Sequence, residues 1–303
     1  MDHRVDPNAY DDLYRRIETE VRHGDYRSAL KLSQEAVTVA RQLGDQELTH
    51  KAISNLSVIY LELGEPKRAE RGLREIILRS SDAAVVCGAA YNLAVSLRRQ
   101  KNVDRAVFFA QKALERARSM RHSTWLSRCY NLLGNIALCQ SDFDEALRHY
   151  RRSLQIRRRM DEDTRFSQAI LLDNIGYCWL LKQRYGKGIG LVHEALTLAE
   201  EVGSKRYVAE SCQDLCFGYM KSGNPRRAIT YGRRALALAE RQGYADIVRN
   251  GYYLLGEAYS RAGRESVAER YYGKLQALYP HLPFLREFLN TFDVSDIIAL
   301  KNP

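Results

Sequence analysis

The sequence has few of the residues that interrupt helices or join separate domains. Of its 303 residues only six are proline and nineteen are glycine, which argues against long disordered linkers. Runs of β-branched residues are scarce, whereas Ala, Leu, Arg, Glu and Gln, which favour helix, are common. No apolar run approaches the ~20 residues needed to span a bilayer. The polar, acidic start MDHRVDPNAYDDL also lacks the basic and apolar parts of a secretion signal. We therefore expect an all-α, cytoplasmic protein that does not enter the membrane.

Motifs that carry catalysis are also missing. The sequence contains no glycine-rich phosphate loop, no GxSxG and no HExxH. Its six cysteines form no CxxC, and its seven histidines recur with no partner carboxylate at a defensible spacing. Buried, reduced cysteines that pack as small hydrophobic residues are the simpler interpretation. The sequence thus predicts a non-enzymatic protein with no catalytic residues, no metal site and no cofactor.

The charge balance is strongly basic, with a formal net charge of +10 and a pI of about 9.3. Such a balance favours acidic partners, namely nucleic acid, an anionic membrane or an acidic protein segment. It does not choose among them.

A small residue recurs along the chain at intervals of 40, 37, 40, 42, 40 and 40 residues. Thirteen residues before all but the first of these anchors stands Leu or Ile, and five residues before each anchor stands Gly or a polar residue. Small residues let two helices approach closely, and Gly accepts the backbone conformation that ends a helix. The pattern predicts helix-turn-helix pairs that bury their apolar faces by stacking on one another. The anchors are Ala29, Ala69, Ala106, Ala146, Gly188, Ala228 and Ala268.

The fragments YNLAVSLRRQKNVDRAVFFAQKALERAR and LDNIGYCWLLKQRYGKGIGLVHEALTLAEEVG resemble tetratricopeptide repeats. The period near 40 exceeds the family's usual 34 and is similar to that of kinesin light chains and bacterial Rap-type regulators. The resemblance implies a right-handed superhelical solenoid of about seven helix pairs. First helices would line its concave face and second helices its convex face. On this interpretation residues 10–280 form the array, residues 1–9 a tail, and residues 281–303 a capping helix (284–292) with a further tail.

Asparagine or aspartate recurs on the first helices, fourteen residues before the anchor. A mid-helix Asn is mildly unfavourable, so its recurrence calls for a reason. Its carboxamide can pair with both N–H and C=O of an extended peptide, and in peptide-binding members of the resembled family Asn at this place does so. The alternative is that Asn bridges neighbouring helices within the array. The residues are Asn55, Asn92, Asn174 and Asp214, with Asn131 and Asn135 in the shifted fourth repeat.

Neighbouring positions of the same helices complete the predicted groove. They are neutral to basic in the early repeats and aromatic and acidic in the later ones. A ligand with an acidic or polar part and an apolar or basic part would match them. These positions are Lys51, Tyr91, Arg128, Asp173, Tyr177, Gln213, Phe217 and Tyr253.

A cluster of arginines occupies the second helix of the fourth repeat and includes Arg151, Arg152 and the run 157–159. It would either bind phosphates or form a solvated convex face, and the acidic residues 161–163 that follow favour the second interpretation. We therefore expect a scaffold or sensor that holds a peptide or partner protein in the concave groove. Two alternatives stay open: a nucleic-acid-associated regulator that uses the basic surface, which is less favoured, and a Rap-like receptor for a signal peptide. The partner's identity and the oligomeric state are left open.

Overall fold

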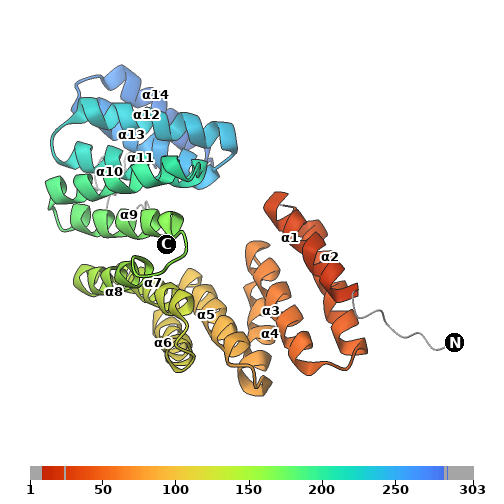
Figure 1. Ribbon diagram of the computed structural model, residues 1–303. Coiled ribbons are helices and arrows are strands. Elements are labelled where there is room, and N and C mark those ends of the chain that lie inside the picture. The colour runs from red at the N-terminus through yellow and green to blue at the C-terminus, as the bar shows by residue number, and fades with distance from the viewer. Residues whose placement is uncertain (1–8, 24, 283–284, 286–303) are drawn as a thin grey trace. The chain divides into compact units, whose positions relative to one another are not determined.

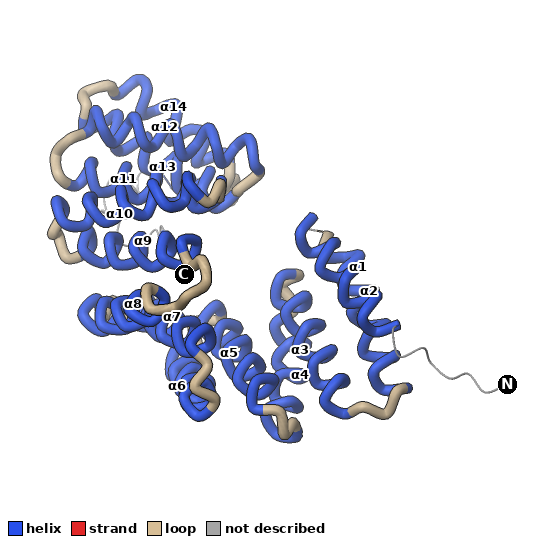
Figure 2. The backbone as a smooth tube through the Cα atoms, viewed as in Figure 1, coloured by secondary structure: helices blue, strands red, loops and turns tan. Residues whose placement is uncertain are grey.

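The computed structural model describes residues 9–23, 25–282 and 285 (Figure 1). All regular structure among these residues is helical, as predicted, and no strand occurs in them (Figure 2). The helices are α1 (Ala9–His23), α2 (Tyr26–Gln42), α3 (Gln46–Glu62), α4 (Pro66–Arg79), α5 (Ala83–Arg99), α6 (Val103–Ser119), α7 (Ser123–Cys139), α8 (Phe143–Arg157), α9 (Arg165–Leu181), α10 (Tyr185–Glu201), α11 (Lys205–Lys221), α12 (Pro225–Gln242), α13 (Ala245–Arg261) and α14 (Glu265–Ala277).

The contacts divide the chain into two units, Met1–Gln140 and Ser141–Pro303. Six of the seven predicted helix pairs lie within one unit, and the fourth pair is divided, with α7 in the first unit and α8 in the second. The right-handed superhelix, its continuous concave face and the limits of the array stay predictions. The predicted capping helix, 284–292, lies outside the described residues except for Leu285.

Within each unit the helices stack as consecutive pairs. In the six pairs that lie within one unit, the first helix packs against the second, as in α3–α4, α5–α6, α9–α10 and α11–α12. Successive first helices also touch one another, which places α3, α5 and α7 side by side in the first unit and α9, α11 and α13 in the second. Each pair thus buries its apolar face against the next pair, as the repeat pattern requires.

The predicted anchors are buried among the packed helices. Every alanine anchor is completely buried. At Gly188 the contact is so close that an added Cβ would lie 2.9 Å from the carbonyl oxygen of Gly176 and 2.5 Å from Cδ2 of Leu180. The backbones of α9 and α10 therefore touch at this glycine pair, which explains why the fifth repeat has Gly where the others have Ala.

The turns inside the pairs use the left-handed backbone conformation predicted for them. Gly64, Gly223 and Gly263 have φ values of 74°, 79° and 69°. Three repeats adopt the same turn without glycine, although a side chain there costs about 1–2 kcal/mol. These residues are Lys101, Ser141 and Gln183, with φ values of 60°, 59° and 57°.

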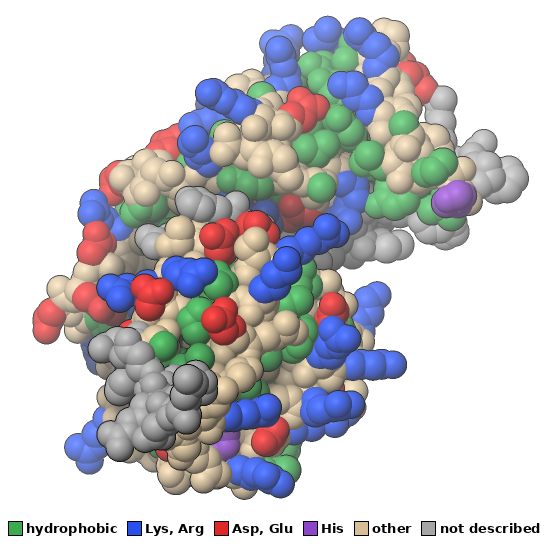
Figure 3. Space-filling view, turned by 90° about the vertical axis from the view of Figure 1, so that its right-hand side faces the viewer, with side chains coloured by type: hydrophobic (Ala, Val, Ile, Leu, Met, Phe, Trp, Pro, Cys, Tyr) green, Lys and Arg blue, Asp and Glu red, His purple; other side chains and the backbone are tan. Residues whose placement is uncertain are grey.

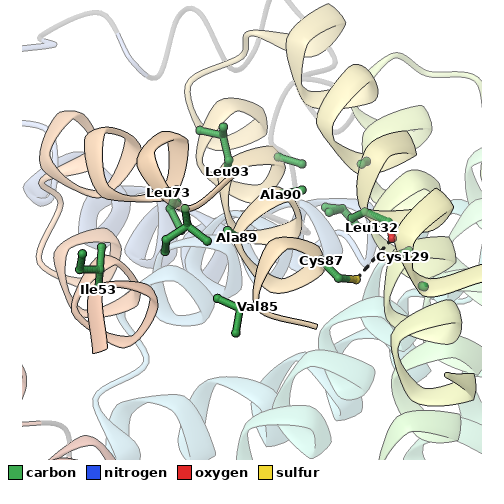
Figure 4. Close-up of a cluster of buried hydrophobic side chains, with 14 of the residues drawn as sticks. Ile53, Leu73, Val85, Cys87, Ala89, Ala90, Leu93, Cys129 and Leu132 are labelled. Atoms are coloured by element: carbon green, nitrogen blue, oxygen red, sulfur yellow. Dashed lines mark hydrogen bonds between the residues drawn. The ribbon is translucent and has the colours of Figure 1, made fainter. Parts of the chain in front are cut away.

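The core of the first unit is continuous from one pair to the next (Figure 4). Ile53 of α3, Leu73 of α4 and Leu93 of α5 are buried in it. The Cys87 thiol donates to the Ala113 carbonyl oxygen at 3.3 Å, which ties α5 to α6, and the buried Cys129 of α7 lies beside it. A hydrogen bond with Cys87, followed by burial, raises the pKa of the Cys129 thiol. Both cysteines are buried free thiols and pack as small core residues, as predicted for them.

Glu47, in the first turn of α3, fastens the start of that helix to the loop between α4 and α5. Its Oε2 accepts from the Ser80 hydroxyl at 2.7 Å, and its Oε1 accepts from the Ser81 backbone N–H and hydroxyl, both at 2.9 Å. These bonds, the Ser80 bond first, lower the pKa of the Glu47 carboxyl to about 2. The carboxylate form is thus the one that holds two successive pairs together.

Replacing Glu47 with glutamine is expected to lower the melting temperature at pH 7, because the amide cannot accept all three bonds. A depressed folded-state pKa contributes stability above the unfolded value of 4.5 that is lost as pH falls through about 2. The difference in melting temperature between wild type and Glu47→Gln should therefore decrease as the pH falls from 4.5 to about 2. Glu75→Gln on α4, which removes no ion pair or hydrogen bond among the described residues, is the matched control. If the difference in melting temperature between wild type and Glu47→Gln stays the same down to a pH of about 2, the Glu47 carboxylate does not have this stabilising role.

Candidate ligand-binding face

The first unit brings its seven predicted groove residues onto three neighbouring first helices. All seven are partly or fully exposed, so they remain available to a ligand. They lie on α3 (Lys51, Asn55), α5 (Tyr91, Asn92) and α7 (Arg128, Asn131, Asn135).

A pocket of about 400 Å³ opens at the α3 end of this face. It contains two predicted residues, Lys51 and Asn55, and gains aromatic walls from α1 that the sequence analysis did not include. One of them, Tyr10, is buried, and burial, with smaller contributions from Tyr14 and Asp11, raises the pKa of its hydroxyl to about 12. The hydroxyl therefore stays protonated at neutral pH. The lining residues are Tyr10, Asp11, Tyr14, Leu48, Lys51, Ser54, Asn55 and Val85.

An aromatic cluster positions Arg128 between α5 and α7. The rings of Tyr91 and Trp125 meet edge to face, with centroids 5.8 Å apart. The Arg128 guanidinium carbon lies 4.5 Å from the Trp125 centroid and 5.0 Å from the Tyr91 centroid. Arg128 forms no ion pair within the described chain, so its N–H groups remain available to an anionic or carbonyl oxygen. The two rings hold this exposed cation in place by cation–π attraction.

Asn55 and Asn92 distinguish between the two roles considered for the recurrent asparagines. Both are half-buried, and within the described part of the chain neither side chain makes a hydrogen bond. They therefore do not bridge neighbouring helices here. A half-buried carboxamide whose donor and acceptor are unused suits a ligand backbone. Asn131 and Asn135, by contrast, do have interaction partners.

The seven predicted residues of the second unit are all buried. Asp173 accepts from the Ser211 hydroxyl at 2.9 Å, which bridges α9 and α11, and Tyr177 and Phe217 pack with ring centroids 6.1 Å apart. These contacts show a packing role, and ligand contact by this set stays a prediction. The set is Asp173, Asn174, Tyr177, Gln213, Asp214, Phe217 and Tyr253, none more than 7% exposed.

The arginines in and just after α8 each contact a different residue of the protein. Arg157 is only 8% exposed and lies 3.7 Å from Glu162. Arg158 lies 3.5 Å from Glu194, and Arg151 sits over the Trp179 ring at 5.5 Å. The acidic neighbours partly neutralise Arg157 and Arg158, which disfavours the interpretation of this cluster as a phosphate-binding surface. Among the described helices, none is long and apolar enough to cross a membrane.

Stacked helix pairs with small anchors and left-handed turns define an α-solenoid. Residues 86–159 and 251–281 each match the tetratricopeptide repeat family. The chain therefore carries tetratricopeptide repeats, and the resemblance seen in its sequence is confirmed.

One curated protein and several solved structures are similar to this chain. The 43 kDa receptor-associated protein of the synapse from Tetronarce californica is 23% identical over 192 residues, which cover 59% of this chain and 45% of that protein. The match thus spans less than half of the relative's length. The apo form of RapI has a TM-score of 0.65 at 12% identity, covering 89% of this chain and 75% of RapI. A Rap protein complexed with the Competence and Sporulation Factor has a TM-score of 0.62 at 13% identity, covering 92% and 98%. At these identities the likeness to solved structures concerns the fold.

Proposed function

We propose that this protein is a non-enzymatic scaffold or sensor, and that its first unit binds an extended peptide segment of a partner along α3, α5 and α7. The observation that carries the proposal is that Asn55 and Asn92 present unused carboxamides on one exposed face. Tetratricopeptide-repeat proteins serve as protein-binding scaffolds, and a similar Rap regulator solved in complex with the Phr* peptide supports a peptide ligand.

The face also indicates what such a peptide would contain. Helices pack about 8–10 Å apart, so three first helices span roughly 20 Å, which an extended chain covers with about six residues at ~3.3 Å each. An apolar or basic side chain would enter the pocket beside Tyr10 and Asp11, and an acidic or polar one would reach Arg128. A receptor for a signal peptide of the Rap-like kind is a narrower form of the same proposal.

A selection from random peptides tests the proposal, because it requires no identified partner. A displayed library of random short peptides is selected on the wild-type protein, and the recovered peptides are then measured against Arg128→Glu by fluorescence anisotropy. Because Arg128 is an exposed, unpaired cation that two aromatic rings hold on this face, we expect the recovered peptides to carry an acidic residue and to bind the variant at least about tenfold more weakly.

The control is Arg116→Glu on α6, which makes the same charge change at an exposed arginine that forms no ion pair with a described residue. It should leave the affinity unchanged. Recovered peptides that bind Arg128→Glu as tightly as wild type would show that the ligand does not use this face.

A further inference from the structure

A second pocket, in which every charged lining residue is basic, lies in the last two helix pairs of the second unit. Its volume is about 300 Å³, and α12, α13 and α14 contribute to it. Figure 3 shows Lys and Arg side chains gathered at the top of the view, the level at which Figure 1 places α12 and α14. The lining contains no carboxylate: its residues are Arg233, Tyr259, Arg264, Val267, Arg270, Tyr271 and Lys274.

The four cations of this pocket are not neutralised by the protein. All are exposed, and none forms an ion pair with a described residue. Neighbouring arginines behave differently, since Arg234 of α12 pairs with Glu200 and Arg206 of α11 pairs with Asp246 at 2.6 Å. Like charges that face one pocket without a counter-ion repel one another, so a bound anion would stabilise the arrangement.

A stacked tyrosine pair gives the pocket a fixed base. Tyr259 and Tyr271 lie nearly parallel, with centroids 5.5 Å apart and planes inclined by 10°. The Arg264 guanidinium carbon lies 5.1 Å from the Tyr259 centroid, and the Lys274 ammonium lies 5.8 Å from the Tyr271 centroid. The rings therefore position the cations, and their faces are occupied by each other and by these cations.

The preceding repeat shows that the tyrosine stack does not itself require such a cationic pocket. Tyr219 and Tyr231 stack in the same way, with centroids 5.6 Å apart and planes inclined by 11°. There, however, His193 contacts both rings, and Arg227 donates to the Tyr219 hydroxyl at 3.3 Å. The stack of Tyr219 and Tyr231 thus has an imidazole and one arginine beside it, whereas the stack of Tyr259 and Tyr271 lies in a pocket lined by four cations.

We propose that this pocket binds a phosphorylated segment of a partner protein. A phosphate monoester carries about two negative charges at neutral pH and three strong acceptor oxygens, which match several converging donors better than one carboxylate does. Arginine presents a planar fork that suits phosphate oxygens. Arg264, the N-cap residue of α14, and Lys274 within that helix are ten residues apart, or about 15 Å at 1.5 Å per residue, so the site also accommodates a second acidic group.

A protein segment fits better than single-stranded nucleic acid. Binding of single strands uses exposed aromatic faces on which bases stack, and both ring faces of this tyrosine pair are already covered. The pocket volume is also suited to one modified side chain. This pocket shares no residue with the α3–α5–α7 face of the first unit, so its test uses different variants from the test of that face.

The experiment measures the affinity of the full chain for a fluorescein-labelled Gly-Ser peptide that carries two phosphoserines. Three related probes accompany it: the unphosphorylated peptide, the same peptide with two glutamates, and a single-stranded oligo(dT). We expect the phosphopeptide to bind most tightly and the unphosphorylated peptide not to bind. Arg270→Glu and Lys274→Glu should each weaken phosphopeptide binding by about ten- to a hundredfold.

Arg226→Glu is the matched control, since Arg226 is an exposed, unpaired arginine of α12 outside the pocket lining, and it should leave the affinity unchanged. If a glutamate variant fails to fold by circular dichroism, Arg270→Gln and Lys274→Gln replace it. The proposal is overturned if the phosphopeptide does not bind, if the glutamate peptide binds equally well, or if oligo(dT) binds more tightly and is lost with the same variants.

Discussion

Replacing Gly188 with alanine is expected to lower the free energy of unfolding by about 2 kcal/mol, although alanine is the better helix former. The added methyl group would lie 2.9 Å from the Gly176 carbonyl oxygen and 2.5 Å from Cδ2 of Leu180. Backbone atoms cannot move aside as the end of a flexible side chain can, so α9 and α10 must separate. Overpacking of this kind costs about 1–3 kcal/mol and outweighs the gain of up to ~1 kcal/mol from helix propensity.

The same helix supplies the control. Gly186 and Gly190 flank the contact, and an added Cβ at either position meets nothing within 4 Å. Gly186→Ala and Gly190→Ala should therefore raise stability by about 0.5–1 kcal/mol. Urea denaturation followed by circular dichroism measures all three variants. Equal shifts in the same direction would mean that the close α9–α10 contact does not set the stability of this pair.

The second large effect concerns ligand binding. Asn92→Ala and Asn55→Ala are each expected to weaken binding of a peptide selected on the wild-type protein by about five- to a hundredfold. The reason is that each carboxamide would lose a hydrogen bond to the peptide backbone and leave a desolvated partner, at a cost of about 1–3 kcal/mol. The melting temperature should stay the same or rise slightly, because neither side chain bonds to a described residue and Ala favours helix.

Isothermal titration calorimetry and thermal melts on the same preparations separate this role from a structural one. Asn102→Ala in the turn before α6 is the control, since Asn102 is exposed and its side chain makes no capping bond. It should leave binding unchanged. A lowered melting temperature with unaltered affinity for Asn92→Ala would instead assign this asparagine to the architecture.

The repeat architecture was predictable because it depends on the spacing of residues that are close together in the sequence. A small anchor, an aliphatic residue thirteen positions earlier and a turn five positions earlier determine where two helices begin, end and touch, and none of these depends on distant residues. The anchors were confirmed by burial, and the turns by their positive φ values. No comparable spacing of residues predicts the division into two units between α7 and α8.

The candidate site was predictable only in part. Spacing placed Asn55 and Asn92 on one face, but Trp125 lay outside the aligned positions, and the α1 tyrosines lay in the repeat that departs most from the pattern. Spacing alone also gave no sign that Asn92 is partly exposed and Asp173 buried, because burial depends on which residues cover a helix face. The basic pocket was missed for a related reason: Arg233 comes from α12, whereas the other cations lie at the N-cap of α14 or within that helix, so no single run of the sequence displays them together.

Ligand binding in the pocket beside Lys51 is expected to be coupled to the packing of α1. Three of its lining residues, Tyr10, Asp11 and Tyr14, belong to α1, whose main packing partner is α2. Transient opening of α1 would remove those walls while leaving Asn92 and Arg128 in place. A ligand that fills the pocket binds only the closed form, so it stabilises α1 by an amount that grows with ligand concentration. Local order in this helix and occupancy of the peptide face are therefore linked equilibria, and amide hydrogen exchange in α1 reports on both.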